Sequence, residues 1–170
     1  MNQHPASSSL LDRLRRTDLA ARVGPVENPD VLAQFIASGV RCVAGQPLLN
    51  EGGIYFGCWL ESTGTINAEL LSRFIPSVAA ATFAGFATHQ RADGLFPYKL
   101  TATGPVFSQI QTVTPLARSV WTHYCLNDHD KAWLAQMYQA MARNDAWLAQ
   151  WRDTRGTGAV EAFCAFDTGH

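Results

Sequence analysis

The chain has 170 residues, a formal net charge of −1 and 16% charged residues, against about 25% in an average globular domain. No block of like charge extends beyond Arg13, Arg15 and Arg16, which excludes a protein drawn by charge to nucleic acid or to an anionic membrane surface. Hydrophobic residues make up 47% of the chain. Much of the surface is therefore expected to be apolar, and self-association through exposed apolar faces is expected with it.

Two consecutive helices are predicted at the N-terminus. Residues 7–23 carry leucines on one helical stripe after a run of serines, and Gly24-Pro25 ends the pattern. Asn28 is predicted to cap a second helix, with Pro29 at its first position, that runs towards Gly45. No apolar run approaches the roughly 18 residues of a membrane-spanning helix, so we expect a cytoplasmic protein with no membrane partner.

The middle of the chain is predicted to alternate loop and helix. Glycines and prolines from Gln46 to Thr65 indicate an ordered loop rather than a helix. Asn67 is predicted to cap the longest helical pattern, within which Pro76 either kinks the helix or begins it. The turn signal Asp93-Gly94 ends this pattern, and residues 95–104 are expected to form a loop.

Two further helices are predicted in the last third of the chain. The first opens near Thr114-Pro115 and ends at Leu126-Asn127, and the second is capped by Asp128 or Asp130 and ends before Gly156. No strand pair is predicted anywhere. The pattern favours an all-α fold, a toroid of helical hairpins whose long loops, rich in Gly, Pro and aromatic residues, gather at one end.

The cysteines and histidines indicate no metal or cofactor. Cys42, Cys58, Cys125 and Cys164 form no Cys-x-x-Cys pair and have no histidine at a zinc-ligand spacing, so we expect them to be reduced and mostly buried. The five histidines form no cluster, and each is expected to be structural or exposed.

The last third of the chain resembles the middle of an (α/α)6-barrel glycoside hydrolase. A Pro-Leu-Ala helix opening at residues 115–117 leads to Val120-Trp121, a second helix ends in Trp151-Arg152-Asp153, and an acidic-small-Gly-aromatic turn follows at residues 167–170. This order is similar to glycoside hydrolase family 63 and to mannosylglycerate hydrolases, glucosylglycerate hydrolases and trehalases. The resemblance covers residues 46–170, and it implies a partial (α/α)6 domain there, preceded by N-terminal helices over residues 1–45.

The resemblance also implies where the reaction chemistry lies. In these families two carboxyl groups about 6.5–9.5 Å apart hydrolyse the glycosidic bond with inversion. The general acid would follow His170 directly and the base would lie much further on, so we expect no catalytic residue in this chain and a truncated, inactive domain. The implied partner is a carbohydrate, with α-glucosides, α-mannosides and glycerate conjugates all left open.

The loop around Trp59 is the main candidate for sugar binding. Tyr55, Phe56, Trp59 and Glu61 combine aromatic rings, which accept the C–H face of a pyranose, with a carboxylate that accepts hydroxyl hydrogen bonds. The segment resembles the family's aromatic-x-x-Trp-x-acidic motif, which implies that Trp59 and Glu61 line the innermost subsite. The alternative is that the rings are core aromatics and Glu61 is a solvated helix cap.

Three more residues are weaker candidates for sugar contacts. Gln109 and Gln111 precede a helix where the family carries Thr-Gln-Pro-Pro, although here the glutamine is displaced by one position. Asp167 matches the acidic residue of the turn before the family's general acid. The segment from Gln90 to Pro97 also resembles a family turn, and Asp93 there is read first as turn chemistry.

Two other classes of function remain open at this stage. A stand-alone helical binding or assembly module would bury its apolar faces against itself or a partner. A helical-toroid polysaccharide lyase would need a Tyr or His base beside a cation, and Tyr98-Lys99 is the pair that suggests one.

Overall fold

The computed structural model describes residues 28–168 apart from residues 44, 52–54, 111 and 113. Its helices are α3 (Pro29–Ser38), α4 (Leu60–Gly64), the π-helix η1 (Asn67–Leu71), α5 (Ser72–Phe74), α6 (Pro76–Thr88), α7 (Leu116–Leu126), α8 (Lys131–Trp151) and the 3₁₀ turn η2 (Ala165–Thr168). Its strands are β1 (Val40–Val43), β2 (Gln46–Leu49), β3 (Cys58–Trp59), β4 (Lys99–Thr101) and β5 (Gly104–Val106). The helix expected at residues 7–23 lies outside the described residues.

The domain is mainly helical, as predicted, but the prediction that it contains no strand pair is wrong. β1 and β2 form an antiparallel hairpin with Val40 opposite Leu49, and β3, β4 and β5 form a second antiparallel sheet in that order. Residues 46–65 and 95–104, which were expected to be loops, supply most of these strands. Each strand has two to four residues, too short to show the alternation by which strands are recognised in a sequence.

Helix α3 is shorter than expected. Asn28 caps it as predicted, because its Oδ1 accepts a hydrogen bond of 3.2 Å from the Val31 amide. The helix ends at Ser38 rather than near Gly45, and the chain turns at Gly39 into β1. The β-branched and cysteine residues of Val40–Val43 favour the strand over another helical turn.

The helix at the centre of the fold begins where a proline allows it. Pro76 is the first residue of α6, which confirms that the long apolar pattern is interrupted there. Asn67 does not cap this region, since it lies inside η1, where its Nδ2 donates to the Ala79 carbonyl at 3.0 Å. A buried amide that bonds the backbone of a different helix, twelve residues further along the chain, serves packing rather than capping.

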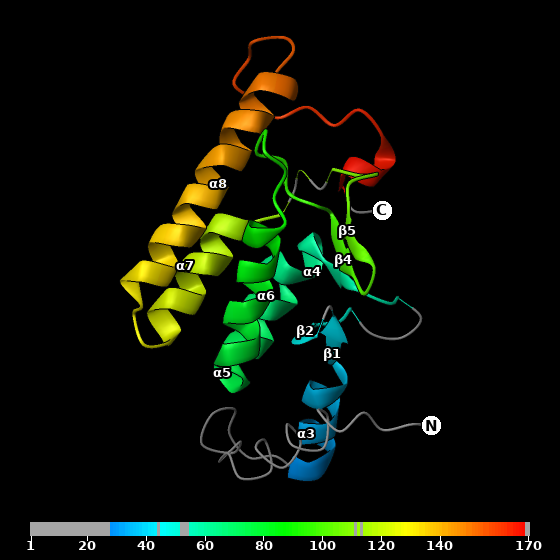
Figure 1. Ribbon diagram of the computed structural model, residues 1–170, viewed down its shortest axis with the longest axis vertical. Coiled ribbons are helices and arrows are strands. Elements are labelled where there is room, and N and C mark those ends of the chain that lie inside the picture. Colours follow the sequence, from blue (N-terminus) through cyan, green and yellow to red (C-terminus); the bar gives the residue numbers. More distant parts are fainter. Residues whose placement is uncertain (1–27, 44, 52–54, 111, 113, 169–170) are drawn as a thin grey trace.

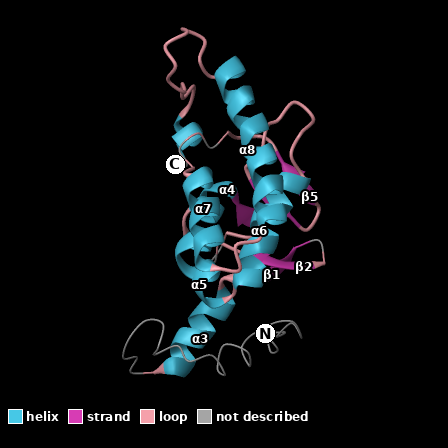
Figure 2. Ribbon diagram, turned by 90° about the vertical axis from the view of Figure 1, so that its left-hand side faces the viewer, coloured by secondary structure: helices cyan, strands magenta, loops and turns pink. Residues whose placement is uncertain are grey.

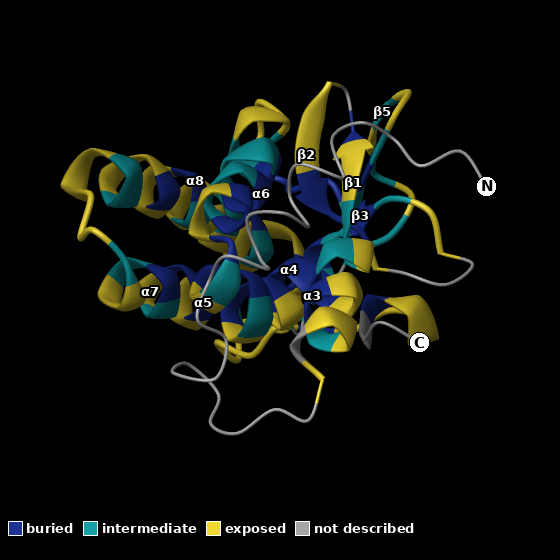
Figure 3. Cartoon of the chain, turned by 90° about the horizontal axis from the view of Figure 1, so that it is seen from below, coloured by how far each residue is buried: buried dark blue, intermediate teal, exposed yellow. Residues whose placement is uncertain are grey.

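Helix α6 carries the core. Figure 1 shows α7 and α8 on one side of it and the two small sheets on the other. The buried side chains of α6 are Val78, Ala79, Thr82, Phe83 and Phe86, and Figure 3 shows the dark buried zone running through α6 towards β1 and β2. The sheets therefore complete the apolar environment of a helix that is buried on more than one face.

Helices α7 and α8 form the clearest helical hairpin, and they lie side by side in Figures 1 and 2. Asp130 caps α8 by accepting from the amides of Ala132 and Trp133 at 2.8 and 3.0 Å, which decides between the two predicted caps. A helical glycoside hydrolase-type domain fits this arrangement. Within the described residues no helix is long and apolar enough to cross a membrane.

Several side chains expected to be buried are exposed. Among the helical tryptophans, Trp147 is buried, whereas 56% of Trp121 and 52% of Trp151 is exposed. The four cysteines are free thiols, as expected, but the prediction that most of them are buried is wrong. Cys58 is buried, while Cys42, Cys125 and Cys164 are exposed.

We expect Gly94→Ala to be one of the most destabilising small substitutions in the chain. Gly94 has a φ of +102°, and a Cβ there would lie 2.4 Å from the Arg143 carbonyl oxygen of α8. The unfavourable φ alone costs about 1–2 kcal/mol, and the backbone clash adds to that cost. Urea denaturation of the variant should show a loss clearly above this range.

Gly156→Ala is the matched control, because Gly156 also has a positive φ of +65° but a Cβ there would meet nothing within 4 Å. Equal losses for the two variants would contradict the close packing of the Gly94 turn on α8.

Candidate functional site

The predicted aromatic loop brings two of its rings together. Trp59 ends β3, opposite Lys99 of β4, and the edge of Tyr55 meets Trp59 with centroids 6.0 Å apart and ring planes at 89°. The Lys99 ammonium lies 3.7 Å from the Trp59 ring centroid. Phe56 lies apart from this pair, since its exposed ring faces the Arg41 guanidinium at 5.2 Å. Trp59, Tyr55 and Lys99 thus form one wall.

Two carboxylates flank this wall. Glu61 lies in the first turn of α4, two residues after Trp59, and is half-buried. Glu51 is close enough to interact with Glu61, with Lys99 and with the Ser62 hydroxyl. Burial raises the pKa of the Glu51 carboxyl above its ordinary 4.5 and the charge of Glu61 adds to the rise, while Ser62 and Lys99 oppose it.

Glu51 and Lys99 escaped the sequence analysis. Glu51 stands in a glycine-rich stretch that was read as loop, and Lys99 was noted only beside Tyr98 as a possible lyase cation. Their positions depend on the pairing of β3 with β4, which no local pattern predicts. The one signal in the sequence is that Glu51 precedes the aromatic motif by a few residues.

Asp167 is held by an ion pair rather than facing an open site. Its carboxylate accepts from Arg152 Nη1 at 2.6 Å and from the Phe163 amide at 2.7 Å, and its side chain is 3% exposed. Burial alone would raise its pKa, but the hydrogen bonds from Arg152 and from the Phe163 and Cys164 amides outweigh burial and lower it. This carboxylate has little capacity left to accept sugar hydroxyls.

The same turn anchors the segment that carries the predicted glutamines. The amide and hydroxyl of Thr112 both donate to the Asp167 carbonyl, at 3.0 and 2.8 Å. Gln109 lies half-buried in this segment, and Gln111 lies outside the described residues. The structure therefore joins Asp167 to the Gln109 segment, but it assigns neither residue a contact with the Trp59 wall.

The Gln90–Gly94 turn is fully used in packing on α8. Gln90 Nε2 donates to the Ala140 carbonyl at 2.8 Å, and its Oε1 accepts from Arg143 at 2.9 Å. The hydrogen bond from Arg91, together with others that include one from Trp147 Nε1, lowers the pKa of Asp93 to about 2. The role of Asp93 is therefore to stabilise this turn and its packing against α8.

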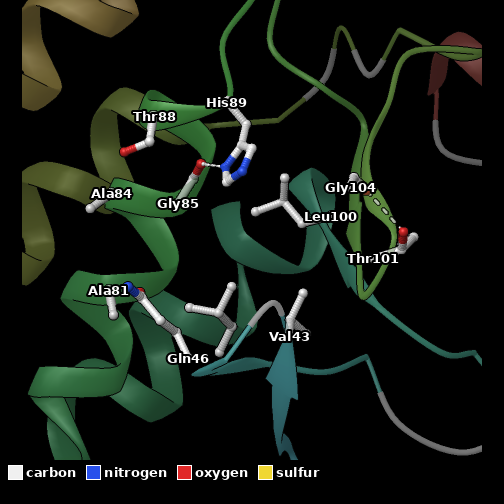
Figure 4. Close-up of a pocket in the computed structure, with 11 residues that line it drawn as sticks. Val43, Gln46, Ala81, Ala84, Gly85, Thr88, His89, Leu100, Thr101 and Gly104 are labelled. Carbon is white, nitrogen blue, oxygen red and sulfur yellow. Dashed lines mark hydrogen bonds between the residues drawn. The ribbon is translucent and has the colours of Figure 1, made fainter.

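An apolar pocket of about 350 Å³ lies between α6 and the two hairpins. Figure 4 shows aliphatic side chains such as Val43 and Leu100 around it, with the His89 ring bound to the Gly85 carbonyl at 2.8 Å. None of the predicted sugar-binding residues that the structure describes lines this pocket. Over the described ranges, no three His, Cys, Asp or Glu side chains gather in a way that could hold a metal ion.

These features define a mainly helical domain with an aromatic wall flanked by two carboxylates. Residues 59–170 match the model of the Mannosylglycerate hydrolase MGH1-like glycoside hydrolase domain. The match covers most of the chain, so the chain belongs to this glycoside hydrolase family, and the resemblance inferred from sequence is confirmed. No curated protein matches the chain significantly.

We expect Asp167→Asn to destabilise the fold by on the order of 3 kcal/mol, because it leaves the buried Arg152 cation without a counter-charge. Because the folded pKa of Asp167 is lowered, its contribution is present above its ordinary pKa of 3.8 and is lost as the pH falls through the folded value. Thermal unfolding at several pH values measures both effects. Arg91→Met, which breaks an exposed ion pair, is the control and should change little.

Glu51→Gln should raise the melting temperature at pH 7. A raised folded pKa means that ionised Glu51 opposes folding above that pKa, and that the effect vanishes below its ordinary 4.5. Wild type and variant should therefore melt alike at pH 3. Glu69→Gln, at an exposed position of η1, controls for the general loss of one negative charge. Glu51 is exposed to solvent, so the rise in melting temperature should be small. A variant that melts lower at pH 7 would contradict the partial desolvation of Glu51 beside Glu61.

Proposed function

We propose that the chain supplies one wall of a sugar-binding site in a glycosidase of this family, with Trp59, Tyr55 and Glu61 in contact with the sugar. The observation that carries this proposal is the edge-to-face pair of Trp59 and Tyr55 with two carboxylates beside it. Aromatic faces receive the C–H face of a sugar, and carboxylates accept its hydroxyl groups. Phe56, Gln109, Gln111 and Asp167 would serve at the edges of this site or position its loops.

The substrate class proposed is the one implied by the family, an α-glucoside, an α-mannoside or a glycerate conjugate. Affinity should be weak. Lys99 covers one face of the Trp59 ring, and a sugar that stacks there must displace the ammonium group. A single wall also buries little of the ligand.

We further propose that the chain alone does not hydrolyse glycosides. A general acid for glycosidic cleavage needs a raised pKa. Asp167 has a lowered pKa and is paired with Arg152, and Glu161 is held at a pKa of about 2 by Thr154 and Arg155. Glu51 has a raised pKa, lies beside Glu61 and bonds Ser62. A Glu51 variant must therefore be included in the hydrolysis assay.

A second candidate function is an assembly module. Tyr138 on α8 and Trp121 on α7 are 66% and 56% exposed, and aromatic residues are enriched at protein–protein interfaces. A monodisperse monomer at high concentration would exclude the assembly module and would leave the sugar-binding proposal unaffected.

Titration with trehalose or glucosylglycerate should show a dissociation constant of about 1 mM or weaker, which corresponds to roughly 4 kcal/mol. Ligand-observed NMR is the suitable measurement, because replacing Trp59 removes part of the fluorescence signal. Trp59→Ala should abolish the binding, and Trp121→Ala, at an exposed tryptophan on α7, should leave it unchanged. Micromolar binding that survives Trp59→Ala would exclude the assignment.

Assays on an aryl α-glucoside, trehalose and glucosylglycerate should show no turnover above buffer. General acid and base groups each contribute about 10² to 10⁴-fold, and a wall without both cannot replace them. Turnover by the wild-type chain that is lost in Glu51→Gln or Glu61→Ala would show that these carboxylates form an active centre. Loss in Asp167→Ala counts only if thermal unfolding shows that the variant is folded, because Asp167 pairs with the buried Arg152.

A further inference from the structure

The Lys99 side chain covers the indole face on which the proposed sugar would stack. Its ammonium nitrogen lies 3.7 Å from the centroid of the Trp59 ring, and the two residues are partners in the antiparallel register of β3 and β4. Side chains of such partners project from the same face of a sheet, so the strand pairing itself brings them together. The contact is attractive, because the face of an indole ring carries negative charge density. The protein therefore fills with its own cation the surface that would receive the C–H face of a sugar.

Backbone geometry guides the Lys99 stem to this position. The stem crosses the aromatic loop at Gly57, where a Cβ would lie 2.6 Å from Lys99 Cε and 3.5 Å from Lys99 Cγ. A side chain at Gly57 would therefore close the path of the stem. The Gly57 backbone is itself held, since its amide donates to Asn50 Oδ1 at 3.2 Å. The ammonium is thus placed by the loop as well as by its attraction to the ring.

A second electrostatic partner for the ammonium lies nearby. The charge of Lys99 acts on Glu51 and opposes the rise in the pKa of that carboxyl, and Glu51 in turn lies close to Glu61. A lysine head sits on a flexible four-carbon stem, so it can move while β4 stays in place. An ammonium that leaves the ring can therefore remain close to a carboxylate. Its displacement costs the ring contact and does not leave the charge isolated.

We infer that Lys99 competes with the sugar for Trp59, so that the ammonium must leave the ring before a sugar can stack there. The inference rests on the sugar-binding wall proposed above and adds the residue that limits its affinity. Cation–π contacts of this kind change an equilibrium constant about two- to tenfold. This factor is the expected loss of sugar affinity that Lys99 causes.

Replacing Lys99 should therefore strengthen sugar binding, whereas loss of a sugar contact or of a structural residue would weaken it. Lys99→Thr removes the stem and the charge and keeps a residue that suits a strand. It should lower the dissociation constant for trehalose about two- to tenfold in ligand-observed NMR. Lys99→Arg retains a cation that stacks on aromatic rings and should bind trehalose as the wild type does. Lys131→Ala, at an exposed position at the start of α8, controls for the loss of one positive charge.

Chemical labelling gives a second measurement that needs no substitution at Lys99. The chain contains only two lysines, Lys99 and Lys131, so acetylation by an N-hydroxysuccinimide ester and peptide mass spectrometry give one rate for each. Without sugar, half-buried Lys99 should react more slowly than Lys131. Trehalose should raise the rate at Lys99, because the released ammonium turns towards exposed Glu51, and should leave the rate at Lys131 unchanged. The Trp59→Ala chain in the same trehalose solution controls for effects of the sugar on the reagent.

The role of Lys99 and the sugar wall itself fail by different results. Equal trehalose binding by the wild type, Lys99→Thr and Lys99→Arg would overturn the role of Lys99 and leave the sugar wall standing. Weaker binding by a folded Lys99→Thr would likewise overturn it, because Lys99 would then be a sugar contact. Absence of trehalose binding in both the wild type and Lys99→Thr would overturn the sugar wall as well. If Lys99→Thr does not fold, an acetylation rate at Lys99 that does not rise with trehalose overturns the inference.

Discussion

The hydroxyl of Thr82, on the central helix, is the point on which the arrangement of helices and sheets depends. It donates to the Val78 carbonyl of its own helix at 2.8 Å and accepts from the Leu49 amide of β2 at 3.0 Å. Both contacts are buried, and without the second the Leu49 amide would be left unsatisfied in the core. The bond fixes β2 against α6, and thereby places β1, Asn50 and the start of the candidate site relative to the helical core.

A second constraint acts at the C-terminal end of the described chain. Arg152 follows α8 and bonds both the Asp167 carboxylate and the Glu161 carbonyl, while Asp167 in turn receives the Thr112 segment. The segment before α7 and the turn after α8 are thereby held together, although they are far apart in the sequence. The family's acidic turn residue, which the sequence suggested as a sugar contact, is the centre of this junction. Its charge stabilises the loops, and loop positioning is as necessary to a binding site as contact.

The sequence was most informative where structure is decided within one turn of helix. Asp130 caps α8, Asn28 caps α3 and Pro76 begins α6, each because capping or a fixed φ acts locally. It was least informative where contacts between distant segments determine the structure. The sheet of β3, β4 and β5 pairs Trp59 with Lys99 across about forty residues of chain, so neither that cation nor Glu51 could be placed beside the ring beforehand. Exposure of Trp121 likewise depends on which face of α7 the rest of the fold covers.

Gly57 determines how closely the aromatic loop approaches β4. Its φ is +122°, and a Cβ there would lie 2.6 Å from the Lys99 side chain and 2.9 Å from the Leu100 carbonyl oxygen. A glycine at this position lets the Lys99 stem cross the loop and reach the Trp59 ring, and lets the Gly57 amide reach Asn50. One residue without a side chain therefore shapes both the aromatic wall around Trp59 and a neighbouring pocket lined by Arg41 and Asn50. Any larger residue would push β4 and the loop apart and disturb the two together.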